Sequence, residues 1–101
     1  MEPKTVERQN ELEDIAKIMR TRGGRRFMWR VLEGAGIFHS SFHTDALMMA
    51  FNEGRRNQGL MLLADIMEID ADNYILMTKE AKARQEAKEL DDERNRAESE
   101  S

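Results

Sequence analysis

A single proline, at position 3, is followed by a chain with no further proline. Proline breaks helices because it lacks an N–H and its ring collides with the preceding turn, so long helices are allowed over the rest of the chain. Strand signals are missing, since β-branched residues are few and apolar residues do not alternate with polar ones between turns. A chain of 101 residues has room for one domain. We therefore predict an all-α fold, a small bundle of three to four helices with a charged C-terminal helical extension.

Apolar residues recur at helical spacing along two early segments. The first predicted helix covers roughly residues 6–20, and the second covers roughly residues 25–33. Glycine readily adopts the φ > 0 conformation that closes many helices, so we expect a glycine-containing boundary after each of them. The glycines expected at these two boundaries are Gly23, Gly24, Gly34 and Gly36.

A third, longer helix is predicted over roughly residues 45–68, with Thr44 as its N-cap and Asp45 favourable to the helix dipole in its first turn. Gly54 and Gly59 lie inside it, and each costs about 1 kcal/mol relative to alanine. The plainest reason for such glycines is the close approach of another backbone. The other reason is a break between two shorter helices.

A fourth helix is predicted to begin near Asn73, with Asp70 or Asp72 as its cap. Its later part is rich in charge and poor in apolar residues, so we expect it to continue to about residue 90 through charge pairs and then fray. The predicted division of the chain is 1–22, an N-terminal amphipathic helix; 23–78, the helical core; and 79–101, a charged C-terminal helix or tail that is partly disordered.

Charge is distributed unevenly along the chain. The formal net charge is −4, which argues against a dedicated nucleic-acid binder. Residues 15–32, however, carry six basic residues and no acidic one, whereas residues 65–72 carry four acidic residues and no basic one. Such polarised charge steers association with partners. Eight methionines add flexible side chains of the kind found on adaptable interfaces.

Several classes of site are disfavoured by composition. The chain has no cysteine, which excludes disulfides and thiolate metal clusters and fits a reducing compartment. No apolar run is long enough to span a membrane, and the polar, acidic start gives no secretory signal. His39 and His43 lie in a predicted loop with only Asp45 as a third ligand, so we expect no metal site. Ser40 and Ser41 lack the strained turn and oxyanion donors of a nucleophile, so we expect no catalysis and no cofactor.

Two Gly-Arg-Arg motifs, at 24–26 and 54–56, raise the question of an anion site. If the second and third helices pack side by side, the two motifs form one four-arginine patch suited to phosphate contacts. The alternative, which an acidic chain favours, is pairing with acids of the same molecule. Neither motif resembles a phosphate-binding loop. The candidate internal partners are Glu33, Glu53 and the acidic 65–72 stretch.

The aromatic residues are predicted to belong to the core, with one exception. Trp29 lies off the apolar stripe of its helix and between arginines, so we expect it to be partly exposed and to contact a partner. The aromatic side chains assigned to the core are Phe27, Phe38, Phe42 and Phe51. The candidate anion- or partner-binding residues are Arg25, Arg26, Trp29, Arg30, Arg55 and Arg56.

The stretch GRRFMWRVLEGAGIFHSSF (24–42), followed by FNEGRRNQGLMLLADI (51–66), resembles a family of small tailed-bacteriophage proteins first noted in a Bordetella phage. The resemblance covers about residues 20–78 and leaves out both ends. The residues that match the family pattern are Gly24, Arg25, Arg26, Phe27, Trp29, Arg30, Leu32, Gly36, Phe38, Phe42, Glu53, Gly54, Arg55, Arg56, Asn57 and Gly59.

This resemblance implies a phage protein encoded near the head and packaging genes, with no established enzymatic activity. Within that setting we expect a virion-associated structural protein of the portal–tail region or the internal ejection core, present in the host cytoplasm during assembly. Its expected partners are other phage structural proteins or further copies of itself in an oligomeric assembly, with nucleic-acid contact through the basic face. The alternatives are a DNA-binding accessory in packaging or replication, and an adaptor or inhibitor that binds a host or phage protein.

Overall fold

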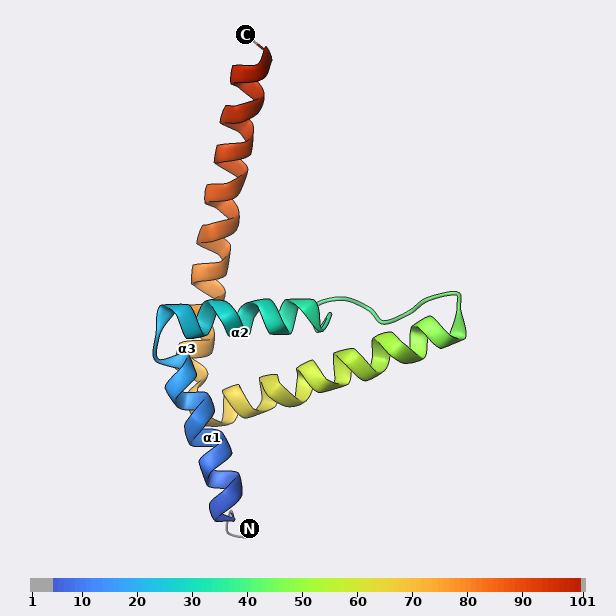
Figure 1. The fold of residues 1–101 in the computed structure, drawn as a ribbon, viewed down its shortest axis with the longest axis vertical. Coiled ribbons are helices and arrows are strands. Elements are labelled where there is room, and N and C mark those ends of the chain that lie inside the picture. Colours follow the sequence, from blue (N-terminus) through green and yellow to red (C-terminus); the bar gives the residue numbers. More distant parts are fainter. Residues whose placement is uncertain (1–4, 101) are drawn as a thin grey trace.

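The computed structural model describes residues 5–100, which form three helices (Figure 1). Helix α1 spans Val6–Met19, α2 spans Arg22–Gly34 and α3 spans Ala46–Glu100. No strand occurs in this described range, so the predicted all-α class is confirmed. Residues 1–4, which include the proline, and Ser101 lie outside the described residues. Across residues 5–100, no helical stretch has both the length and the apolar content that a bilayer span requires.

The boundary between α1 and α2 is made by Thr21 and not by the glycine pair, so this part of the prediction was wrong. Thr21 accepts a hydrogen bond from the backbone N–H of Gly24 at 2.9 Å and thereby caps α2. Gly23 and Gly24 both lie inside the first turn of α2, and neither has a positive φ. A β-carbon on Gly24 would stand 1.8 Å from the carbonyl oxygen of Ile18. Glycine is therefore needed here because the start of α2 touches the end of α1.

The end of α2 follows the prediction more closely. Gly36 has φ +77°, the left-handed conformation that closes helices, and it lies two residues beyond the last helical residue. A loop of residues 35–45 follows. Helix α3 is capped by Asp45 and not by Thr44, because the Asp45 carboxylate accepts the backbone N–H groups of Leu47 and Met48 at 2.8 and 3.1 Å.

Helix α3 is bent where the third and fourth helices were predicted to separate. Asp70 has non-helical backbone angles and divides α3 into a first half, 46–69, and a second half, 71–100. Its carboxylate accepts the backbone N–H of Asn73 at 3.1 Å and the side-chain amide of the same residue at 2.6 Å. The predicted cap at Asp70 is therefore confirmed, but the break shrinks to one residue. The second half is helical to Glu100, beyond the residue 90 to which the helix was expected to continue; the fraying of this end stays a prediction.

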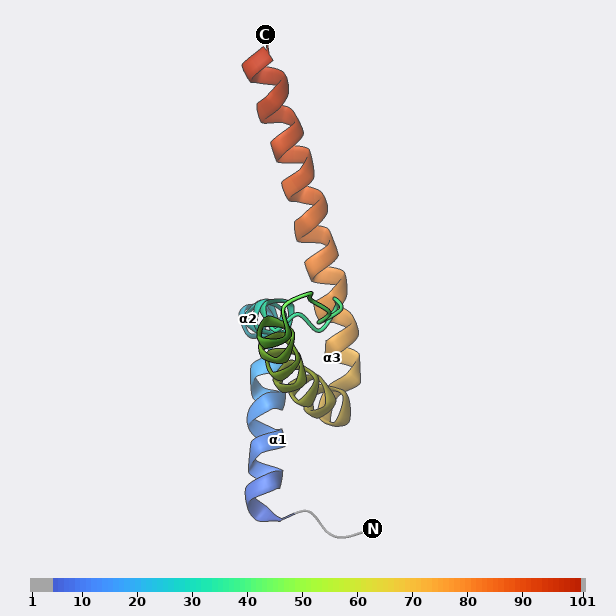
Figure 2. The ribbon, with the colours of Figure 1, turned by 90° about the vertical axis from the view of Figure 1, so that its right-hand side faces the viewer.

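The described chain is extended rather than a closed bundle. Its radius of gyration is 17.7 Å and its extents are 65 × 39 × 16 Å, whereas a compact domain of this length has a radius of gyration of about 13 Å. The second half of α3 and α1 run along the long axis, and α2 and the first half of α3 project to one side (Figures 1 and 2). The C-terminal end of α3 extends away from the other helices.

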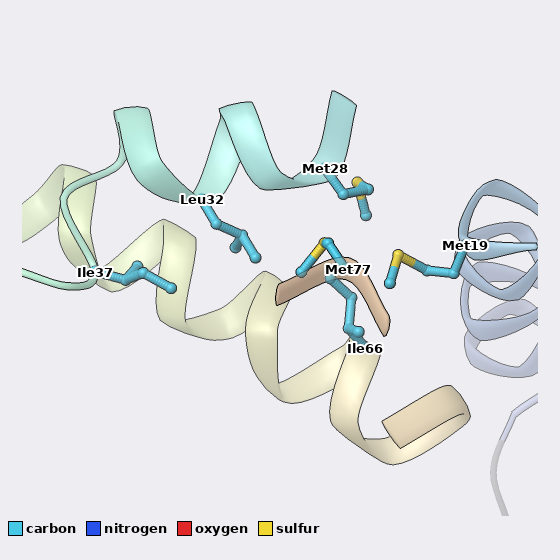
Figure 3. Packing of buried hydrophobic residues seen from close by; sticks show 6 residues of the cluster. All are labelled: Met19, Met28, Leu32, Ile37, Ile66 and Met77. Carbon is cyan, nitrogen blue, oxygen red and sulfur yellow. The ribbon is translucent and has the colours of Figure 1, made fainter. Parts of the chain in front are cut away.

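A small core lies where the three helices meet. Leu32, Ile66 and Met77 are fully buried and come from α2 and from the two halves of α3. Figure 3 shows these side chains converging with Met19 of α1. The core residues drawn there are Met19, Met28, Leu32, Ile37, Ile66 and Met77.

Gly59 allows the chain after α2 to lie directly on the first half of α3. A β-carbon at this position would stand 2.6 Å from the Ala35 Cβ and 2.6 Å from the Ile37 Cγ2. The close approach predicted for a glycine inside this helix is therefore confirmed at Gly59. It is not the reason for Gly54, where a β-carbon would have no neighbour within 4 Å.

Candidate anion-binding cleft and apolar arm

Arg25, from the first Gly-Arg-Arg motif, is directed into the protein. It is only 8% exposed, and its guanidinium donates to the Glu80 carboxylate from Nε at 2.6 Å and from Nη2 at 3.3 Å. Its Nη1 donates to the carbonyl oxygen of Met19 at 2.9 Å, and Arg22 Nε donates to the same Glu80 at 3.1 Å. These bonds join α1, α2 and the second half of α3. Arg25 is therefore held by an internal acid, as one alternative expected, but that acid is none of the candidates named from sequence.

The Arg25–Glu80 contact changes the acidity of both groups. The hydrogen bond from Arg25 is the main cause that lowers the pKa of the Glu80 carboxyl below its ordinary value, against the opposing effect of burial. The same hydrogen bond raises the pKa of Arg25. Because the folded state holds Glu80 ionised, the pair stabilises the fold above the carboxyl's unfolded pKa of about 4.3, and this contribution is lost as the pH falls through the lowered value.

A second ion-pair cluster joins α1 to the first half of α3. Arg8 donates to the Asp65 carboxylate and lies 3.6 Å from Glu68, while its Nη1 contacts Glu11 at 3.1 Å. The hydrogen bond to Asp65 is the main cause that raises the pKa of Arg8. Part of the acidic 65–72 stretch is thus bound by an arginine that sequence reasoning did not single out, because nothing local relates residues 57 positions apart.

The exposed arginines of α2 line a cleft of about 430 Å³ against the second half of α3, which we call the basic cleft. Arg26 and Arg30 come from successive turns of α2, and Arg84 comes from α3. Within the described residues, neither Arg26 nor Arg84 makes an ion pair, and Arg30 lies over the Phe27 ring at 5.4 Å. The residues lining the basic cleft are Gly23, Arg26, Phe27, Trp29, Arg30, Glu33 and Arg84.

Trp29 is half-buried, as the sequence predicted, and lies between the basic cleft and a second groove along α3. Its ring stacks on Phe38 with the ring centroids 5.0 Å apart. This contact ties the loop after α2 to the helix. Whether Trp29 contacts a partner stays a prediction. Sequence reasoning missed Arg84 because this residue belongs to the segment predicted as a charged C-terminal helix or tail.

The second Gly-Arg-Arg motif lies at the other end of α2, so the four-arginine patch, the less favoured of the two alternatives, is not formed. Arg55 and Arg56 border a small pocket with the residues that follow α2, whereas Arg26 lies in the first turns of that helix, about 12 Å along its axis from the last helical residue, Gly34. Arg56 Nε donates to the carbonyl oxygen of His39 at 3.2 Å, and Arg55 lies over the Phe51 ring at 5.7 Å. These two arginines support the loop and the start of α3.

The HSSFH segment is a loop, as predicted. His43 Nδ1 accepts the backbone N–H of Asp45 at 3.0 Å, and Ser41 donates to the Glu53 carboxylate. The described residues contain no group of three or more histidine, cysteine or acidic side chains placed to hold a metal ion.

The aromatic residues assigned to the core are instead on the surface. Phe27, Phe38, Phe42 and Phe51 are each between 45% and 75% exposed. Helical spacing places such residues on one stripe, but it does not show whether another element covers that stripe. Three of them lie in residues 38–61, the loop from residue 38 onward and the α3 residues 46–61, which we call the apolar arm.

The apolar arm exposes a row of large side chains along α3. Leu47, Phe51 and Met61 are 84%, 62% and 57% exposed. At about 100° per residue, the three positions fall within an arc of about 80° on the helix surface, so they share one broad face. Phe42, in the loop that precedes α3, is 75% exposed. Monomeric proteins rarely expose large apolar side chains in such series, which are typical of surfaces that bind other proteins.

Comparison of the chain with known protein families identifies a match. Nothing among the curated proteins or the solved structures matches the chain. The family model described as Bbp19-like phage protein matches residues 15–79, more than half of the chain. The match includes α2, the apolar arm and the kink at Asp70, and it ends before Arg84. The chain therefore belongs to the family of Bbp19-like phage proteins.

Proposed function

We propose that this phage protein is a virion-associated structural subunit, whose apolar arm is buried against other phage structural proteins or further copies of the chain. The observation that carries the proposal is the exposure of Phe42, Leu47 and Phe51 on one projecting arm. Burying such side chains contributes about 1.5–3 kcal/mol each, so an assembly that covers the arm is strongly favoured.

The shape of the protomer supports the same role. A thin, extended chain with a small core offers much surface relative to its volume, which suits a subunit ordered within a larger particle. Met48, Met61 and Met67 are exposed on the first half of α3, and methionine adapts to irregular partner surfaces. We place the subunit in the portal–tail region or the internal ejection core, without a catalytic role.

Particle composition tests this proposal. Purified, extensively washed virions are analysed by quantitative mass spectrometry before and after DNA ejection. A fixed copy number in intact particles supports the structural role. Loss of the chain together with the DNA places it in the ejection core, and retention in emptied particles places it in the portal–tail region. Absence from washed virions contradicts the proposal.

A second candidate function, a DNA-binding accessory in packaging or replication, is favoured by the basic cleft. Arg26 and Arg84 face this cleft without an ion pair among the described residues. An accessory of this kind binds DNA in infected cells but is missing from washed particles. The two candidates therefore differ in the same mass-spectrometric measurement.

A further inference from the structure

The N-terminal part of α2 carries more positive charge than its surroundings neutralise. A helix N-terminus has about half a positive unit charge and favours acidic residues, but the first turn of α2 contains no acid. Glu80 is the acid that pairs there, and it is already bonded to Arg22 and Arg25. Arg26 and Arg84 make no ion pair within the described residues. An anion bound in the basic cleft would reduce the electrostatic repulsion between these arginines and the positive end of the α2 dipole.

The basic cleft presents its arginines from two sides. Arg26 and Arg30 come from α2, and Arg84 comes from α3 across the cleft. Guanidinium groups are planar forks that bind phosphate oxygens in pairs, and groups from two helices can grip a phosphate from opposite sides. The volume of about 430 Å³ is in the ordinary range of ligand sites. The cleft is therefore large enough for more than an isolated phosphate ion.

Aromatic rings line the same cleft as the arginines. Phe27 is 49% exposed and Trp29 is half-buried, and both border the basic cleft. Rings beside guanidinium groups are typical of nucleic-acid sites, where bases stack on the rings while phosphates contact the cations. A purely acidic peptide would use the arginines but would add no planar group to stack on the exposed part of the Phe27 ring.

We propose that the basic cleft binds the phosphodiester backbone of nucleic acid, with Arg26, Arg30 and Arg84 as the phosphate contacts. Glu33 also lines the cleft, and its negative charge opposes this binding. The rest of the chain is acidic overall, so it repels nucleic acid and confines the contact to this cleft. This inference rests on the second candidate function and deepens it by naming the phosphate contacts. It does not depend on the structural role, since binding is measured with the isolated chain and not with phage particles.

The test measures binding of the full-length chain to a fluorescent duplex and to a single strand of about 20 nucleotides by anisotropy, over a range of salt. We expect binding at about 50 mM salt, with a log–log slope of about −2 to −3 for the duplex. Arg26→Gln/Arg84→Gln is expected to weaken binding at least about tenfold and to reduce the slope by about 2. Within the described residues, neither side chain makes a hydrogen bond that the fold would lose, and circular dichroism checks that the variant is helical.

The matched control removes the same charge elsewhere. Arg94→Gln/Arg96→Gln changes two exposed arginines near the end of α3, away from the basic cleft, and is expected to change affinity less than about twofold. Glu33→Gln is expected to tighten binding about twofold, because it removes a like charge from the site.

Three outcomes overturn the inference. The first is no binding of either nucleic acid at low salt. The second is an equal loss in the two double variants, which indicates diffuse charge attraction. The third is binding of poly-glutamate as tight as that of the duplex, which indicates an acidic protein partner.

Discussion

The junction of the three helices and the apolar arm differ in how completely their side chains are paired and covered. At the junction, Arg25 pairs with Glu80 and Arg8 pairs with Asp65, and the side chains of Leu32 and Met77 are fully buried. On the arm, side chains as large as Leu47 and Phe51 are mostly in solvent. The junction therefore stabilises the protomer, whereas the arm is the region that the proposed assembly would cover.

The largest expected effect comes from one substitution made in both regions. Leu32→Ala removes a side chain with no exposure and should lower the free energy of unfolding by about 3 kcal/mol. Leu47→Ala makes the same chemical change at 84% exposure and should cost about 0.5 kcal/mol or less. Urea unfolding followed by circular dichroism measures both. Similar losses at the two positions would remove the distinction between junction and arm.

A second, smaller contrast comes from replacing one glycine of each region with alanine. Gly24→Ala forces a β-carbon against the Ile18 carbonyl oxygen and should destabilise the fold by about 2 kcal/mol. Gly54→Ala, on the arm, meets no neighbour within 4 Å and should stabilise it by up to about 1 kcal/mol through helix propensity. Thermal unfolding of the two variants measures both changes in stability. If Gly24→Ala does not destabilise the fold, the tight contact between α1 and α2 is disproved.

The ion pair at the junction gives a pH-dependent prediction. Glu80→Gln should lower the melting temperature by about 5 °C at pH 7, since Arg25 then loses its charged partner. Because the pKa of Glu80 is lowered in the folded state, the difference from the unmodified chain should persist above about pH 4.3 and shrink as the pH falls further. Calorimetry from pH 3 to 7 is the measurement. Glu86→Gln, an exposed acid on the same helix, is the control, and a pH-independent difference would speak against the pair.

The fold class, the loop at residues 35–45, the closing role of Gly36 and the cap at Asp70 could be predicted because they depend on nearby residues. The family could be predicted from two local motifs. The Arg25–Glu80 pair could not, since its partners are 55 residues apart and meet only because α3 bends.

The exposed aromatic residues show the other limit. Phe51 and Leu47 have the periodicity of a buried stripe, yet the helix that carries them extends beyond the region that α2 covers. Periodicity reports which residues share a face, and only the arrangement of other elements decides whether that face is covered. Arg84 was missed for a related reason, because a charged segment without an apolar stripe gave no sign that its first turns contact α2.

The most direct test of the arm as the assembly surface compares the incorporation of two variants into phage particles. Leu47→Ser/Phe51→Ser changes the arm, whereas Leu90→Ser changes an exposed leucine of the second half of α3. Complementation of a phage lacking the gene, followed by quantitative mass spectrometry of washed virions, gives the copy number of each. We expect the arm variant to fall at least about tenfold, the loss that about 1.4 kcal/mol of binding energy produces, while Leu90→Ser stays at the level of the unmodified chain. Equal incorporation of all three chains, or absence of the unmodified chain from the particles, would contradict this role of the arm.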